Sequence, residues 1–268
     1  MKRHCFSYSI REIAPYIDWS YLLHAWGIGC NDMQATEEII RDAKEILRVL
    51  DGKHCTQGIF ALCDAKSKDD DIIIEGTTLP LLRQQHSNAG KYNLCLSDFI
   101  SPKNDRIGVF ATSIDAAFGQ EYTNDEYRFL LAQTLADRLA EATAALLHKQ
   151  VRTDSELWGY APDEQLLIED LLAEKNQGIR PAIGYPSLPD QSIIFTVDRL
   201  LGLKDIGITL TVSGAMHPHA SVCGLMIAHP AARYFAVGKI DREQLCDYAR
   251  RRGTSPEEIA RFLTKNLE

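Results

Sequence analysis

The stretch from Gly178 to Pro189 limits the fold more than any other part of the chain. It reads Gly-Ile-Arg-Pro-Ala-Ile-Gly-Tyr-Pro-Ser-Leu-Pro, with three prolines and two glycines in twelve residues. Proline lacks an N–H and fixes φ, whereas glycine opens positive φ and lets another molecule approach the backbone. The stretch is therefore neither a regular helix nor a central strand. We predict a shaped loop that carries one permanent cation, Arg180, and one aromatic face, Tyr185.

This composition suits a small zwitterionic ligand that has a carboxylate and a flat ring. Arg180 can pair with a carboxylate in a bidentate geometry, and Tyr185 can pack against a ring. A structural connector between two elements explains the composition equally well, because many proline-rich loops bind nothing. The residues of the loop alone leave both interpretations open.

The rest of the chain shows helical and strand patterns that do not alternate. We expect helical segments over 11–25 (as short turns), 34–51, 123–150, 163–175, 241–251 and 255–266. We expect strands over 56–65, 71–75, 106–113, 208–212, 221–227 and 233–237. Thr123-Asn-Asp-Glu126 resembles a capping box that opens the longest helix. The order predicts an α+β class with a mainly antiparallel twisted sheet flanked by helices. Without repeats or long linkers, residues 1–268 are expected to form one domain.

Composition excludes several classes of function. The chain is 45% hydrophobic and 25% charged, as expected of a globular protein with a sizeable core, and its net charge is −8. A nucleic-acid partner is not expected, because phosphate contacts need clustered Lys and Arg. A membrane span is not expected either, since no run of 18 apolar residues occurs. The first eight residues hold no apolar core of a secretory signal, so we expect a cytoplasmic protein.

The seven cysteines, which include Cys30, are scattered and form no C-x-x-C pair. This pattern predicts reduced thiols and no zinc site. His217 and His219 flank a proline, and on a strand both rings would face one side, as metal ligands can. No third ligand is near in sequence, so surface histidines are favoured over a metal site.

Three acidic residues could bind a cation. Asp137 and Glu141 lie one helical turn apart and form either a solvated helix face or a pair that attracts a positive charge. Asp18, between apolar neighbours, is either a helix N-cap or a ligand for an ammonium group. No Ser/His/Asp or Cys/His arrangement is visible, so no catalytic residue is assigned.

Further short sequence motifs, here called blocks, follow one another along the chain. They are Tyr16-Ile-Asp-Trp19, Leu82-Arg-Gln-Gln85, Cys95-Leu-Ser-Asp-Phe99, Arg106-Ile-Gly-Val-Phe110, Leu135-Ala-Asp-Arg-Leu-Ala-Glu-Ala142, Trp158-Gly-Tyr-Ala-Pro-Asp-Glu164, Ala220-Ser-Val-Cys-Gly224, Ala232-Arg-Tyr-Phe-Ala-Val-Gly238 and Asp247-Tyr-Ala-Arg-Arg-Arg-Gly253. Together with Gly178–Pro186, these blocks resemble the activation domain of cobalamin-dependent methionine synthase. The resemblance runs from about residue 10 to the end and implies a single curved α+β domain. The loop is similar to that family's S-adenosylmethionine (SAM) loop.

The resemblance implies a set of SAM contacts. Asp18 is expected to bind the methionine amino group and Arg180 its carboxylate. Ala182 and Gly184 are expected to offer backbone contacts to the adenosine part, against which Tyr185 packs.

Further residues are implied less directly. Tyr234 and Phe235 match other family contacts, and Glu174 is a weaker candidate just before the loop. Asp137 and Glu141 are expected to face the cofactor cleft or the partner.

The chain departs from the family pattern at three positions. Ile183 stands where proline is common, and Leu188 stands where the family has cysteine. His217 replaces a tryptophan, so we expect one wall of the cleft to differ in shape and polarity.

The implied function is reactivation by reductive methylation. In the family, cobalamin drifts to an inactive cob(II) state, and reduction by one electron lets it take the methyl group of SAM. Homocysteine, folate and cobalamin modules are absent from these 268 residues. We therefore expect action on cobalamin carried by a separate polypeptide, and no methionine synthesis by this chain alone.

The resemblance also implies a flavodoxin-like electron donor. Docking an acidic donor needs a local basic patch on this protein or its partner, and Arg250-Arg-Arg252 is the only candidate run here. These arginines end a predicted helix, where the dipole favours cations, so a helix end is favoured over a docking patch.

Two other functions fit the same residues: a SAM-binding sensor or docking module, and a reactivator of another corrinoid methyltransferase. A Rossmann-type methyltransferase would also bind SAM. It needs a glycine-rich turn after a buried strand, and Gly27-Ile-Gly29 is the only stretch that resembles such a turn. No buried strand precedes this stretch, so a Rossmann-type site is not expected.

Overall fold

The computed structural model describes residues 1–29, 32–86 and 92–267, so Cys30 lies outside the described residues. The helices are α1 (Ile10–Ile13), α2 (Trp19–Ala25), α3 (Met33–Leu50), α4 (Glu126–Thr153), α5 (Ile168–Leu172), α6 (Ile194–Leu201), α7 (Arg242–Arg252) and α8 (Pro256–Ala260). The strands are β1 (Lys2–Ser9), β2 (Cys55–Lys68), β3 (Asp71–Ile74), β4 (Thr77–Pro80), β5 (Asp105–Ile114), β6 (Thr209–Leu210), β7 (Met216–His217) and β8 (Ser221–Met226).

The main sheet is organised around the long strand β2. Along one edge, β2 pairs first with β1 and then with β3, while β5 pairs along its other edge. β4 continues the sheet beyond β3, and β8 continues it beyond β5. Every one of these pairs is antiparallel, which confirms the predicted α+β class with an antiparallel sheet flanked by helices.

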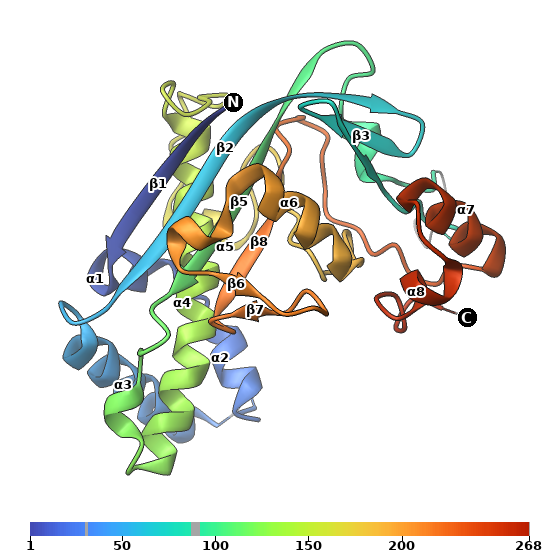
Figure 1. Cartoon of the computed structure of the whole chain (residues 1–268). Helices are drawn as coiled ribbons and strands as arrows, with labels where there is room; N and C mark the ends of the chain where they lie inside the picture. Colours follow the sequence, from blue (N-terminus) through green and yellow to red (C-terminus); the bar gives the residue numbers. More distant parts are fainter. Residues whose placement is uncertain (30–31, 87–91, 268) are drawn as a thin grey trace.

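Alternating side chains divide the core between the two faces of the sheet. In β2, Ile59 and Ala61 belong to the apolar layer that contains α6, whereas Phe60 packs in the layer that contains α4. Figure 1 shows α6 and α4 on either side of the strands, with α2 and α3 gathered near one end of α4. α7 and α8 lie at the opposite end of the molecule, near β3 (Figure 1).

α4 is the long helix that the sequence predicts, with a shifted start. Its N-cap is Asp125, whose carboxylate accepts from the N–H of Arg128 at 3.1 Å. The expected capping box at Thr123 is therefore wrong by two residues, because Gln120–Tyr122 already form a short 3₁₀ turn. α3 agrees with its prediction, and its buried stripe consists of Ile39, Ala43, Ile46, Leu47 and Leu50.

Other expected elements are shorter, absent or new. β1 and β4 were not predicted, because their polar residues hide the alternation of an edge strand. The helix expected over 163–175 is reduced to α5, because Glu164 is held by Arg152 of α4 at 2.7 Å. The last expected helix ends at Ala260, and the strand over 208–212 shrinks to β6.

The segment over 233–237 forms no strand. Its backbone groups pair with side chains and with the 178–189 loop instead of with a neighbouring strand: the N–H of Phe235 donates to Ser187 Oγ at 3.2 Å, and that of Val237 to the Pro186 carbonyl at 2.9 Å.

In the described residues, no helix combines the length and the apolar composition needed to cross a membrane.

The 178–189 loop is joined to the sheet through the free edge of β8. Ile179 and Ile227 exchange two backbone hydrogen bonds of 2.9 Å, and the N–H of Ile183 donates to the Cys223 carbonyl at 2.9 Å. A Cβ on Gly224 would collide with the carbonyl oxygen of Pro181 and lie 2.9 Å from Cα of Ala182. Glycine at 224 is therefore the residue that lets the loop approach β8.

We expect Gly224→Ala to destabilise the protein by about 1–3 kcal/mol, because an overpacked contact with backbone atoms forces a shift. In a chain of this size, this corresponds to a loss of roughly 2–4 °C in Tm for each kcal/mol. Gly58→Ala in β2 is the control, since its nearest neighbour lies at 3.5 Å, an ordinary contact distance. Equal melting temperatures for the two variants would contradict the close approach.

Candidate functional site

A cleft of about 740 Å³ lies between the loop, the start of α2, the middle of α4, the end of α5 and the 234–235 segment. It gathers eight of the ten residues predicted from the sequence. These are Asp18, Glu141, Glu174, Arg180, Ala182, Tyr185, Tyr234 and Phe235. The cleft therefore brings together segments that lie more than 200 residues apart in the chain.

Arg180 faces the cleft because the loop alternates like a strand. Ile179 and Ile183 are buried in the α6 layer, whereas Ala182 packs in the α4 layer. The backbone N–H of Arg180 donates to the hydroxyl of Tyr234 at 2.9 Å. Within the described residues, its guanidinium makes no hydrogen bond or ion pair, so all five of its N–H donors are available to a ligand.

Asp18 serves as the N-cap of α2, one of the two roles expected for it. Its Oδ1 accepts from the N–H and the hydroxyl of Ser20 at 2.9 and 2.5 Å. Both bonds use the same oxygen, and among the described residues Oδ2 has no hydrogen-bond partner. Capping and ligand binding are therefore compatible, because they use different oxygens.

Tyr185 and Glu141 connect the loop to α4 across the cleft. The Tyr185 hydroxyl donates to the Glu141 carboxylate, although the tyrosine side chain remains 50% exposed. Partial burial raises the pKa of Tyr185 above its ordinary value of 10, and the negative charge of Glu141 adds to the effect. The tyrosine therefore stays neutral, and its ring presents an aromatic face to the cleft.

The other predicted residues differ in how they reach the cleft. Glu174 lies at the end of α5 with a φ of +55° and an exposed side chain. Phe235 is half-buried, and its carbonyl accepts from the Ser187 hydroxyl. Burial raises the pKa of the Tyr234 hydroxyl, which keeps this group neutral.

Two of the ten predicted residues do not line the cleft. Gly184 has a φ of +85°, and its N–H donates to the Leu188 carbonyl at 2.8 Å, so only its carbonyl remains for a ligand. Asp137 lies 3.8 Å from Nε2 of His219, and burial raises the pKa of this carboxylate.

The structure also decides two other sequence features. His217, which was expected to shape one wall, lies exposed in β7 and outside the cleft lining, so this expectation is wrong. Arg250-Arg-Arg252 forms the last turn of α7, the interpretation that the sequence favoured, and not an open basic patch. Arg251 pairs with Asp71, and Arg252 donates to Ser192 Oγ at 2.7 Å, next to the buried Asp190.

The remaining lining residues were not predicted. They are Tyr16, Tyr21, Arg138, Ala142, Ala145, Leu171, Leu172, Ala173, Pro181, Pro186 and Ser187. Tyr16 stands two residues before Asp18, and Arg138 stands between Asp137 and Glu141, so the sequence blocks held a signal for these two. Leu171–Ala173 gave none, because an apolar helix end carries no chemical signature.

A buried polar cluster that includes a histidine of α4 packs against the start of the 178–189 loop. His148 is fully buried in α4, and its Nε2 lies 2.8 Å from the Tyr160 hydroxyl. A Cβ on Gly178 would lie 2.9 Å from that hydroxyl, so Tyr160 packs against the start of the loop. Burial lowers the pKa of His148 well below 6.5, and the nearby charges of Arg152 and Arg180 lower it further.

In the described part of the chain, no three His, Cys, Asp or Glu side chains are arranged to hold a metal ion, and the six described cysteines are free thiols.

Comparison with known proteins identifies the family. The family model described as vitamin B12 dependent methionine synthase, activation domain, matches residues 9–253. A crystal structure of the MetH reactivation domain bound to AdoHcy is 36% identical in sequence and has a TM-score of 0.91 to this chain. The match covers 100% of this chain and 90% of that one. The chain therefore belongs to the activation-domain family of B12-dependent methionine synthase, as the sequence blocks predicted.

Burial of neutral His148 predicts a specific pH dependence of stability. Below roughly pH 6.5, the unfolded chain takes up a proton on this histidine that the folded chain excludes, so the free energy of unfolding falls as the pH falls. The slope from this one proton approaches about 1.4 kcal/mol per pH unit.

Urea unfolding at several pH values between 5 and 7.5 measures this slope. We expect His148→Leu to remove it, whereas replacement of the exposed His24 by leucine leaves it unchanged, because that ring meets solvent in both states. Parallel pH profiles for the native protein and His148→Leu would contradict a neutral buried imidazole.

Proposed function

We propose that this chain binds SAM in the cleft and presents its methyl group to cobalamin carried by a partner module, so that inactive cob(II)alamin is restored by reductive methylation. The observation that carries the proposal is the guanidinium of Arg180, which has no partner in the described part of the chain and lies at the wall of a cleft that also contains acidic and aromatic side chains. Family membership and a neighbour solved with AdoHcy, the demethylated form of SAM, support it.

The residues of the cleft fit SAM in size and in chemistry. About 740 Å³ is within the range of small-molecule sites, which is roughly 300–1,000 Å³. Arg180 binds the carboxylate of the methionine part with its two-pronged donor geometry, and Oδ2 of Asp18 accepts from the ammonium group. Tyr185 packs against the adenosine part, and Ala182 and the carbonyl of Gly184 contact it through the backbone.

The remaining candidates complete the site. Tyr234 and Phe235 of the 234–235 segment and Glu174 after α5 also line the cleft and are proposed to contact the ligand. Glu141 adds negative charge where the sulfonium is positive, which favours SAM electrostatically. Asp137, beside His219, is proposed to face the cobalamin partner rather than SAM.

The cobalamin must be held by residues outside these 268, because the match to the reactivation domain already accounts for all of them. We propose a separate polypeptide as its carrier, with residues 1–268 acting as one domain. Cobalamin supplies the metal that is reduced and that accepts the methyl group, and this chain supplies position and charge.

The electron donor is proposed to be flavodoxin-like. It would dock on the cobalamin partner rather than on Arg250-Arg-Arg252, because Arg251 and Arg252 are engaged internally. The free thiols of the described cysteines support a cytoplasmic location.

The first test is calorimetric titration of SAM and AdoHcy. We expect saturable binding by the native protein and a loss of affinity of at least about tenfold in Arg180→Ala, because a charged hydrogen-bonding partner contributes about 1.5–3 kcal/mol. Arg180→Lys is expected to restore part of the affinity, since lysine keeps the charge but not the paired donors.

Arg11→Ala is the control, because this side chain is 86% exposed and pairs with Asp51 away from the cleft. Native affinity in Arg180→Ala would exclude the proposed site. If SAM binds but no cobalamin protein is methylated when added with a reductant, the chain is a SAM-binding sensor or docking module.

A further inference from the structure

Tyr234 and Phe235 reach the cleft on a segment without regular secondary structure, residues 232–239, here called the strap. The strap is fastened to the ligand loop at three points. The Tyr234 hydroxyl accepts from the N–H of Arg180, the Phe235 N–H donates to Ser187 Oγ, and the Val237 N–H donates to the Pro186 carbonyl. The strap therefore adds a second support to the Arg180 backbone, beside the pairing of the loop with β8.

A glutamine outside the cleft lining, Gln84, holds the middle of the strap, and Asn266 holds its end through the Gly238 carbonyl. Nε2 of Gln84 donates to the Ala236 carbonyl at 2.8 Å, between Phe235 and Val237. Oε1 of the same amide accepts from the N–H of Leu94 at 3.0 Å, and the backbone N–H of Gln84 donates to the Leu94 carbonyl at 2.9 Å. Gln84 is half-buried and does not line the cleft.

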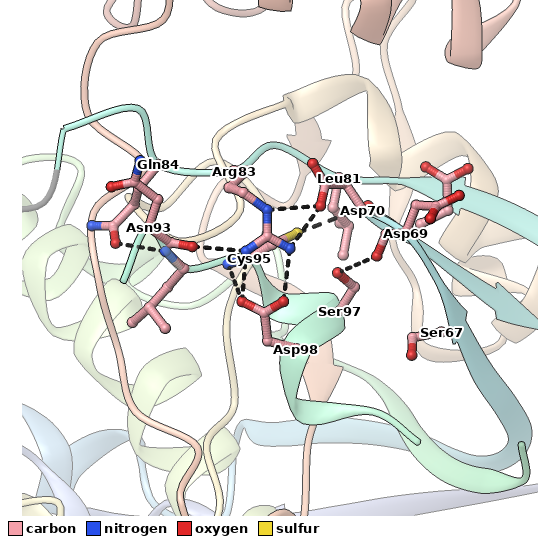
Figure 2. A network of polar contacts seen from close by, with 12 residues as sticks. Ser67, Asp69, Asp70, Leu81, Arg83, Gln84, Asn93, Cys95, Ser97 and Asp98 are labelled. Atoms are coloured by element: carbon pink, nitrogen blue, oxygen red, sulfur yellow. Dashed lines mark hydrogen bonds and ion pairs between the residues drawn. The ribbon is translucent and has the colours of Figure 1, made fainter. Parts of the chain in front are cut away.

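The backbone segment that carries Gln84 is held in place by the neighbouring residue Arg83. Figure 2 shows the guanidinium of Arg83 at the centre of a polar network. It donates twice to the Asp98 carboxylate, at 2.7 and 2.8 Å, and also to Asp70 at 2.8 Å and to the Asn93 carbonyl at 2.7 Å. Hydrogen bonds from Arg83 hold the pKa of Asp98 below its ordinary value although burial raises it, so the pair stays ionised. The backbone segment that carries Gln84 is therefore held firmly.

α7 is hydrogen-bonded to the same backbone segment and its side chains. Nε2 of Gln244 donates to the Arg83 carbonyl at 2.8 Å, and the N–H of Asp241 donates to Oε1 of Gln85 at 2.6 Å. The blocks Leu82-Arg-Gln-Gln85 and Cys95-Leu-Ser-Asp-Phe99 thus support the end of the strap as well as its middle, although neither block contributes a residue to the cleft.

We propose that Gln84 is a positioning residue of the SAM site: its amide fixes the strap, and through Tyr234 the strap fixes Arg180 for ligand binding. This proposal rests on the proposed function. The chemistry of the position is specific, because the Gln84 amide donates through Nε2 to one backbone group and accepts through Oε1 from another at the same time. Glutamate at this position has the same shape, and one carboxylate oxygen still accepts from the N–H of Leu94. Its second oxygen faces the carbonyl oxygen of Ala236, and two acceptors repel each other.

Gln84→Glu is therefore the decisive variant, and Gln57→Glu is its matched control. Gln57 is also half-buried, and its amide also donates at 3.2 Å, to Ser7 Oγ at the β1–β2 pairing far from the cleft lining. Two readouts are needed: the Kd for AdoHcy by calorimetry, and amide hydrogen exchange of Phe235, Val237 and Arg180 in the absence of ligand.

We expect Gln84→Glu to weaken AdoHcy binding at least about tenfold and to accelerate exchange at these three amides, while Gln57→Glu changes neither. A purely structural role would lower the melting temperature of both variants alike and leave Kd unchanged. Native Kd in Gln84→Glu overturns the proposal.

The experiment separates this proposal from the proposed function. If the native protein binds no AdoHcy, the proposed function fails, and the exchange readout alone decides whether Gln84 positions the strap: unchanged exchange overturns it. If Gln84→Glu does not fold, the uncharged Gln84→Met, which also lacks the donor, replaces it with the same expected direction in both readouts.

Discussion

The pairing of the 178–189 loop with the edge of β8 is the contact on which the cleft depends. A segment with three prolines cannot form a regular ladder, yet Ile179 and Ile183 supply the N–H groups that the β8 edge needs. Ile183 donates one of these bonds, which a proline at this position could not do, because proline has no N–H. Gly224 permits the approach, and the resulting alternation buries both isoleucines and turns Arg180 toward the cleft.

Charged groups inside and outside the cleft are treated differently. Buried basic side chains outside it are paired or kept neutral, whereas a positive charge stays available in the cleft. The buried Arg152 is paired with Glu164, and burial together with two arginines keeps His148 neutral. The guanidinium of Arg180 has no internal partner among the described residues, so its charge stays available in the cleft. The C-terminal part of the chain returns to hold this arrangement through the strap. The blocks Leu82-Arg-Gln-Gln85 and Cys95-Leu-Ser-Asp-Phe99, which lie outside the cleft lining, belong to the support of the strap.

The parts predicted well were those with a strong local pattern. The amphipathic stripes of α3 and α4 and the apolar runs of β2, β5 and β8 depend on neighbours in sequence. Errors occurred where long-range contacts override local preference. The 163–167 segment is drawn out of a helix by the Arg152–Glu164 pair, and the 233–237 segment is used as a strap rather than a strand. β1 pairs with β2 although most of its residues are polar, so its sequence carried only a weak strand signal.

The sequence by itself determined the class of fold, the family and eight residues of the cleft, because turn chemistry, helical periodicity and motif order are local properties. Only the tertiary structure decided that His217 lies outside the cleft lining, that Gly184 keeps its N–H for Leu188, and that Arg251 and Arg252 serve as internal anchors. It alone identified Gln84 as a support of the strap. These decisions join groups up to 180 residues apart, and no pattern of spacing along the chain encodes which of them meet.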